Sequence, residues 1–210
     1  MSQIAFYILS DVHGFIFPTD FSSREKDLPM GLLKANHLIE QDCVHYDGSV
    51  KIDNGDFLQG SPLCNYLVSK LKSSLPLTSI YNRLGFDFGT VGNHEFNYDL
   101  PYLKQTINQL HYPVLCANII ENAQPFTGQG IHYFKVNGLT IGTIGLTTQY
   151  IPHWEQPDYI KTLTFNSAIH TLKSELPTLR EKSDIVVVSY HGGFERDLDS
   201  GLPTEALTGE

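Results

Sequence analysis

The sequence has 210 residues, of which 41% are hydrophobic, so it can bury one sizeable core and is not an intrinsically disordered chain. Its formal net charge is -9 at pH 7, which excludes a protein that coats DNA or RNA through a basic surface. If such an acidic protein handles phosphate groups, cations must assist it. No stretch is long and apolar enough to predict a membrane span.

The start of the sequence and its cysteines bear on the compartment. The first residues, MSQIAFYILSDVHG, have no basic region of the kind that opens a secretory leader. Cys43, Cys64 and Cys116 are widely spaced, and their odd number leaves one unpaired in any disulfide scheme. We therefore expect a cytoplasmic protein, or an exported one if a leader precedes this sequence.

Apolar, β-rich runs alternate with helix-like segments along the chain, and no linker or internal repeat is visible. In chain order, strands are expected at residues 4–9, 88–91, 113–118 and 184–190, and helices at residues 30–40, 62–71, 100–110 and 165–176. Asn166 is the expected N-cap of the last helix. Asn137-Gly138 separates two apolar runs and predicts a β-hairpin, so a mixed sheet is expected. The alternation predicts one layered α/β domain.

Four apolar runs end in polar groups next to glycine. The groups that follow them are Asp11-Val12-His13-Gly14, Gly55-Asp56, Gly92-Asn93-His94-Glu95 and His191-Gly192-Gly193. The carboxyl ends of strands in α/β sheets form the crevice where ligands bind, and glycine lets backbone and ligand approach closely. We therefore expect these side chains to converge.

The chemistry of such a cluster points to divalent cations. Carboxylate, imidazole and carboxamide groups suit zinc, manganese, iron or similar ions, and no cysteine lies among them. Asp11 and His13 can hold one ion, Asp56 can bridge, and Asn93 and His191 can serve a second ion. Each residue also has an ordinary explanation as a turn former or a strand end. Their joint occurrence at four strand ends favours the metal site.

These segments resemble a known family. The stretches DVHG, DNGDFLQGSPL, LGFDFGTVGNHEFNYDL, PVLCANI, IGTIGLTTQYIPHWEQP and HGGFE are similar to those of the calcineurin-like metallophosphoesterases. The similarity is greatest to the catalytic domain of the 5'-nucleotidase and 2',3'-cyclic-nucleotide 2'-phosphodiesterase group, and it extends from about Ile4 to about Leu207. It implies a layered fold in which mixed β-sheets pack between helices, and a single catalytic domain over residues 1–210.

The resemblance also implies residue roles. Asp11 and His13 would ligate a first divalent ion, Asp56 would bridge, and the second ion would be held by Asn93 and His191. His94 would be the catalytic imidazole in a two-metal hydrolysis of nucleotide phosphate esters. Glu95 is expected to stabilise the turn instead.

Two departures from the family pattern affect these expectations. Asn97 stands where some nucleotidases have an aspartate beside the catalytic histidine, so a carboxamide would orient His94, as in the cyclic-phosphodiesterase branch. No Gly-His-x-His or Gly-His-x-Gln turn precedes Glu210. We therefore expect a domain that is incomplete at its C-terminus and that lacks the last metal ligands and a second nucleotide-recognition domain. Such a fragment is expected to bind its metal ions weakly, to be weakly active or inactive, and to self-associate through the surface left uncovered.

Other functions stay open at this point. The chain could bind metal or a nucleotide without turnover, act on another small phosphate ester, or use the cluster only structurally. The sequence selects neither the metal nor the choice among 5'-, 3'- and 2',3'-cyclic nucleotides. The expected partner is a small nucleotide, with no polymeric nucleic acid and no membrane.

Overall fold

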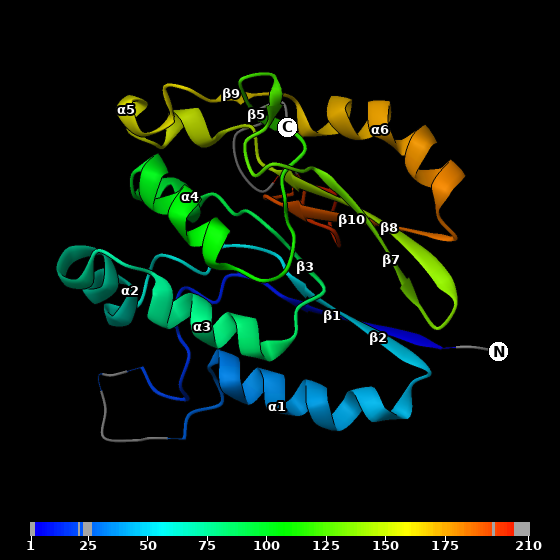
Figure 1. Ribbon diagram of the computed structural model, residues 1–210, viewed down its shortest axis with the longest axis horizontal. Coiled ribbons are helices and arrows are strands. Elements are labelled where there is room, and N and C mark those ends of the chain that lie inside the picture. The colour runs from blue at the N-terminus through cyan, green and yellow to red at the C-terminus, as the bar shows by residue number, and fades with distance from the viewer. Residues whose placement is uncertain (1–2, 21, 23–26, 195, 204–210) are drawn as a thin grey trace.

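The computed structural model describes residues 3–20, 22, 27–194 and 196–203, and Figure 1 shows their arrangement. Residues 204–210, which belong to the stretch on which the expectation of an incomplete domain depends, lie outside the described residues. Glu195 of the HGGFE stretch also lies outside them.

The first sheet is all-parallel and has the order β1-β2-β3-β4. Its strands are β1 (Ile4–Leu9), β2 (Gly48–Asp53), β3 (Phe88–Thr90) and β4 (Val114–Leu115). The strand expected at residues 113–118 is shorter than predicted. Beyond Leu115 the backbone bonds elsewhere, because Cys116 N–H donates to Gln129 and Ala117 N–H to Gly145.

The second sheet is mixed, as the hairpin signal predicted. Its order is β10 (Ile185–His191), β8 (Leu139–Thr147) and β7 (Ile131–Val136), with β10 parallel and β7 antiparallel to β8. Asn137 and Gly138 connect β7 to β8 with φ of 47° and 82°, the left-handed pair that a tight hairpin requires. A small antiparallel sheet of β6 (Gln124–Pro125), β5 (Ile119–Glu121) and β9 (Thr164–Phe165) was not predicted.

The helices alternate with the strands as predicted, but their first and last residues differ from the predicted ones. They are α1 (Leu32–Asp42), α2 (Pro62–Tyr66), α3 (Leu75–Leu84), α4 (Leu100–Gln109), α5 (Pro157–Ile160) and α6 (Ala168–Lys182). The segment expected as one helix at residues 62–71 changes from α to π geometry at Leu67. Short 3₁₀ turns cover Cys43–His45, His94–Asn97 and Ile151–His153. Neither α3 nor the short α5 was predicted from the sequence.

Asn166 is not the N-cap of α6. Ser167 takes that place and its side chain accepts the His170 N–H. Asn166 is instead held by Asn118, which accepts its N–H at 2.9 Å and donates a side-chain N–H to its carbonyl at 3.1 Å. The N-cap therefore lies one residue later than predicted, and the helix begins at Ala168 and not at residue 165.

Three hydrophobic clusters show that the molecule has four layers, helix, sheet, sheet and helix. The largest joins α1, α3 and α4 to the first sheet and includes Leu32, Tyr81 and Leu103. A second lies between the two sheets, where Phe88 packs near Phe134. The third joins the second sheet to α6, which lies along it in Figure 1. The predicted fold of sheets packed between helices is confirmed, because each sheet face has its own apolar cover.

None of the helices within the described residues combines the length and apolarity needed to span a bilayer. Cys43, Cys64 and Cys116 are free thiols, and Cys64 and Cys116 are buried.

Candidate metal centre and catalytic residues

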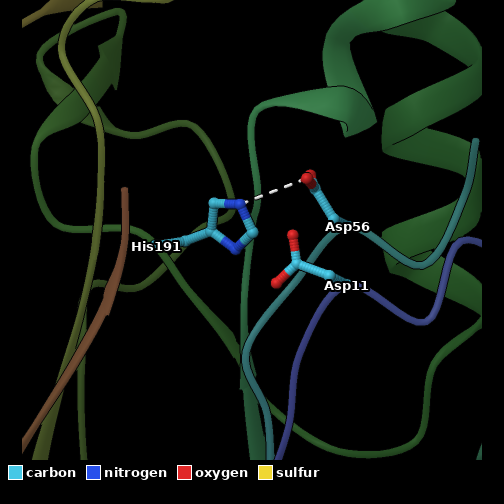
Figure 2. A group of neighbouring side chains, drawn as sticks. All are labelled: Asp11, Asp56 and His191. Atoms are coloured by element: carbon cyan, nitrogen blue, oxygen red, sulfur yellow. Dashed lines mark ion pairs between the residues drawn. The ribbon is translucent and has the colours of Figure 1, made fainter. Parts of the chain in front are cut away.

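The two sheets bring the predicted side chains to one place. Asp56 follows β2 and Asp11 follows β1 in the first sheet, while His191 ends β10 in the second. One ligand atom from each of these three residues lies within 4.8 Å of the other two. Figure 2 shows the three side chains pointing toward one another from their separate strands. The predicted convergence is therefore seen for this trio. Parallel pairing of β1 and β2 places Asp11 and Asp56 at one edge of the first sheet, and packing of the two sheets brings His191 to them.

Two histidines present the same ring nitrogen to Asp56. The Nδ1 atoms of His13 and His191 are held by the backbone carbonyls of Gln59 at 2.7 Å and Asn54 at 2.6 Å. The Nε2 atoms lie 4.0 Å and 3.2 Å from Oδ2 of Asp56. A carbonyl on Nδ1 places the proton there, so that Nε2 is free to ligate a cation. Asp56 thus lies between two prepared imidazole ligands.

The remaining predicted ligands complete the two sides of Asp56. Asp11 Oδ1 lies 4.0 Å from His13 Nε2 on one side. Asn93 Oδ1 lies 3.2 Å from His191 Nε2 on the other. Asp11 thus lies beside His13 and Asn93 beside His191, while a ligand atom of Asp11 also lies within 4.8 Å of one on His191. The assignment of these residues to two ions stays a prediction.

Asn54 fixes His191 from the first sheet and was missed by the sequence reading. Besides accepting from the His191 ring through its carbonyl, it accepts from the Ser189 hydroxyl at 2.6 Å and donates to the Tyr190 carbonyl at 3.3 Å. These contacts join the end of β2 to the end of β10. The position of His191 relative to Asp56 is therefore set by hydrogen bonds across both sheets.

The loops that carry the ligands have an unusual backbone. Asp11, His13 and Asp56 all have φ between 50° and 57°, a left-handed conformation that costs a non-glycine residue roughly 1 to 3 kcal/mol. The loops hold one another in it, since Asp11 N–H donates to Gly55 at 3.0 Å and His13 N–H to Asp56 at 2.8 Å. Backbone strain of this kind is concentrated at functional sites.

Glu95 holds two of these loops together and is not positioned as a ligand. Its side chain is buried, and its two oxygens accept four backbone N–H groups, those of Asp56, Phe57, Leu58 and Gly92, at 2.6 to 3.1 Å. Four donors match the four lone-pair positions of an ionised carboxylate. Glu95 therefore supports the loops that carry Asp56 and Asn93.

His94 borders the metal cluster without joining it. Its N–H donates to Asp56 Oδ1 at 2.8 Å, and its ring meets the His13 ring edge-on at 5.3 Å between centroids. Its Nδ1 lies 2.6 Å from Asn97 Oδ1, as expected for an orienting carboxamide. The Asn97 amide in turn donates to Glu155, a partner the sequence reading did not identify.

The ion pair between His191 and Asp56 determines the pKa shifts in the cluster. Burial alone would lower the pKa of His191, but its contact with Asp56 outweighs burial and raises that pKa to about 9. Burial would raise the pKa of Asp56, yet the His191 and His94 contacts lower it below the ordinary value. Without a cation, His191 therefore balances the buried negative charge of Asp56. A cation would take over this role.

The donor set fits divalent metal ions. Buried carboxylate oxygens and oriented imidazole nitrogens are ligands that manganese, zinc and iron accept. Within the part of the chain that the structure describes, no other group of three His, Cys, Asp or Glu side chains meets the same distance criterion.

The other histidines contribute no further cluster. His37, His45, His111, His132 and His170 were expected to be surface or packing residues. His153 stacks on Tyr150 with ring centroids 3.9 Å apart, and Trp154 is 58% exposed. His153 therefore packs within its own loop, and the neighbouring Glu155 is the residue that contacts Asn97.

Comparisons with known proteins agree with this geometry. The family description calcineurin-like phosphoesterase matches residues 4–207. The 2',3'-cyclic-nucleotide 2'-phosphodiesterase/3'-nucleotidase of Salmonella typhimurium is 34% identical over 202 residues, which are 90% of this chain and 31% of that protein. The corresponding protein of Haemophilus influenzae is 31% identical over 198 residues, 88% of this chain and 30% of that protein.

A solved structure is more similar still. The crystal structure of a putative 5'-nucleotidase from Staphylococcus aureus, in complex with alpha-ketoglutarate, has 65% sequence identity and a TM-score of 0.94. The match covers 99% of this chain and 41% of that one. The chain thus spans about a third of the length of the curated relatives it matches.

Proposed function

Because the chain belongs to the calcineurin-like phosphoesterase family, we propose that its protein hydrolyses phosphate esters of nucleotides with two divalent metal ions. The related proteins are hydrolases named as nucleotidases and cyclic-nucleotide phosphodiesterases. The observation that carries the two-metal proposal is the placement of Asp56 between His13 and His191, each with Nε2 directed to the same carboxylate oxygen.

In this proposal Asp11 and His13 hold one ion, Asn93 and His191 hold the other, and Asp56 bridges them. When bound, the ions neutralise phosphoryl charge and lower the pKa of a coordinated water. This chemistry also explains how a protein of net charge -9 can accept an anionic substrate.

His94 is proposed as the catalytic imidazole. Asn97 occupies its Nδ1, which leaves Nε2 as the ring nitrogen available to a substrate. From that nitrogen His94 would hydrogen-bond the phosphoryl group or protonate the leaving oxygen. Its backbone N–H bond to Asp56 fixes the ring beside the cluster.

For the substrate, we propose 2',3'-cyclic nucleotides ahead of 5'-mononucleotides. The proposal rests on the carboxamide of Asn97 beside the catalytic histidine and on the names of the matched curated proteins, which include the cyclic phosphodiesterase activity.

Hydrolysis of a small substrate panel tests this function. The chain is incubated with bis(p-nitrophenyl) phosphate, 2',3'-cyclic AMP, 3'-AMP and 5'-AMP in the presence of manganese, zinc or a chelator. We expect turnover only with metal, fastest on the cyclic substrate. Nucleotide binding without hydrolysis under any metal would favour a binding module, while hydrolysis of the synthetic diester alone would indicate a different phosphate ester.

Two variants separate the proposed roles. His94→Ala should retain metal binding while reducing turnover by about two to four orders of magnitude, the range for loss of a general acid or base. Loss of metal in this variant would show that His94 is a ligand. His170→Ala, which changes an exposed residue of α6, is the matched control and should leave both properties unchanged.

A further inference from the structure

A chain of three side chains runs outward from His94. His94 and Asn97 belong to one 3₁₀ turn, and Glu155 comes from the connection between the turn at Ile151–His153 and α5. The His94 Nδ1 lies 2.6 Å from Asn97 Oδ1, and Asn97 Nδ2 donates to Glu155 Oε1. The two residues of the second contact are 58 positions apart in the sequence. Their meeting is thus a property of the fold and not of a local turn.

The donors and acceptors in this chain permit only one arrangement. An ionised carboxylate can only accept hydrogen bonds, so Glu155 must receive the amide N–H of Asn97. The oxygen of the same amide then faces His94, and Nδ1 of the imidazole must carry the hydrogen between them. Without Glu155, the Asn97 amide could turn over and present its nitrogen to the ring, which favours the opposite tautomer.

The surroundings of Glu155 support this arrangement. Its backbone N–H donates to the Ile151 carbonyl at 3.0 Å, which fixes the segment that carries it. The side chain is half-buried, and burial raises its pKa, while the Asn97 hydrogen bond and the nearby His94 ring oppose that rise. The carboxylate thus interacts favourably with both residues of the turn.

We propose that Glu155 is a positioning residue that sets the tautomer and orientation of His94 through the amide of Asn97. The inference rests on the proposed function of His94. In this chain the pair of Asn97 and Glu155 places a carboxylate one residue further from the ring than a directly bonded aspartate would. It still leaves Nε2 of His94 as the nitrogen that faces a substrate.

An exchange of the two groups tests the pairing. Asn97→Asp alone places two carboxylates in contact, and Glu155→Ala alone frees the amide to turn. In the double variant Asn97→Asp/Glu155→Gln, the new glutamine can donate to the new aspartate, whose other oxygen accepts from His94 Nδ1. We expect each single variant to lower kcat about tenfold with KM changed less than about twofold, and the double variant to recover to within about threefold of the parent.

A second readout does not depend on turnover. In the metal-free protein, with the imidazole neutral, the ¹⁵N chemical shifts of His94 report which ring nitrogen carries the hydrogen, and His94→Gln identifies its signals. The parent and the double variant should show hydrogen on Nδ1, and Glu155→Ala should show a mixture. Glu181→Ala, at an exposed position of α6, is the matched control and should resemble the parent.

The outcomes separate this inference from the proposed function. Unchanged His94 shifts and kcat in Glu155→Ala, or a double variant no better than Asn97→Asp, would overturn the role of Glu155. If the parent hydrolyses no substrate, the proposed function fails, and the ¹⁵N shifts still decide whether Glu155 sets the tautomer. Urea unfolding of each variant shows whether a loss of kcat comes from misfolding. If Glu155→Ala does not fold, Glu155→Gln takes its place, because it keeps the side-chain volume, and it should give an intermediate mixture of tautomers.

Discussion

Glu95 offers a direct test of how the ligand loops are held. The proposed change is Glu95→Gln, which keeps the size of the side chain and replaces one carboxylate oxygen by an amide NH₂. Oε2 accepts the N–H groups of Asp56 and Gly92, and Oε1 those of Phe57 and Leu58. Whichever way the glutamine amide turns, two buried N–H groups face a donor and lose their acceptor.

The expected change in the free energy of unfolding follows from the number of hydrogen bonds that Glu95→Gln removes. A hydrogen bond to a charged group contributes about 1.5 to 3 kcal/mol, so two of them represent roughly 3 to 6 kcal/mol. Part of this loss is offset because the variant no longer buries a charge, and burial is the main cause that raises the pKa of Glu95. We expect a net decrease of about 3 kcal/mol in the free energy of unfolding.

Urea unfolding in the presence of a chelator measures this change without a contribution from bound metal. The control is Glu181→Gln on the exposed side of α6, which should change the free energy of unfolding by less than about 0.5 kcal/mol. A loss below about 1 kcal/mol in Glu95→Gln would refute the reasoning, because it would mean that the four N–H groups do not depend on the carboxylate.

Three further predictions concern the residues around Asp56. Asp56→Asn should weaken manganese binding by more than about 100-fold in calorimetry, since it removes the carboxylate that we propose as a ligand; binding at the parental affinity would show that Asp56 is not a ligand. In the parent, manganese binding should release a proton near pH 7, because contact with Asp56 raises the pKa of His191 to about 9; equal heats in buffers of different ionisation enthalpy would contradict this. Burial raises the pKa of Asp53 to about 7. The native state therefore binds more protons than the unfolded state between about pH 4 and pH 7. As pH rises through that window, the free energy of unfolding of the metal-free protein should fall by at most about 4 kcal/mol. Asp53→Asn should flatten this fall in unfolding experiments, and an unchanged pH profile would count against it.

The sequence predicted the parts of the site that depend on strand ends. Polar residues next to glycine mark where parallel strands stop, and strands of one sheet bring those stops together. Asp11 and Asp56 follow paired strands in this way, and the hairpin at Asn137-Gly138 was likewise specified by two adjacent residues. The assignment of the ligands to two separate ions stays a prediction.

The supporting contacts could not be predicted in the same way. Asn54 reaches β10 across 137 residues, and Glu155 reaches Asn97 across 58. Asn54 stands directly before Gly55, but nothing in the local sequence of Asn54 or Glu155 marks its partner, because each contact forms only when distant segments of the chain pack together. Glu95 was recognised as a turn-stabilising residue, but its four backbone donors come from two loops whose contact the sequence does not encode locally.

Because His191 belongs to the second sheet, the cluster can form only through contacts between residues that are far apart in the sequence. His191 meets Asn93 across 98 residues and Asn54 across 137, and contacts of such long sequence separation form slowly because the chain must first close large loops. During synthesis Asp11, His13, Asp56 and Asn93 leave the ribosome well before β10 does. The nascent chain thus presents four of the polar side chains without their histidine partner from the second sheet. Completion of the cluster therefore requires that the two sheets have docked.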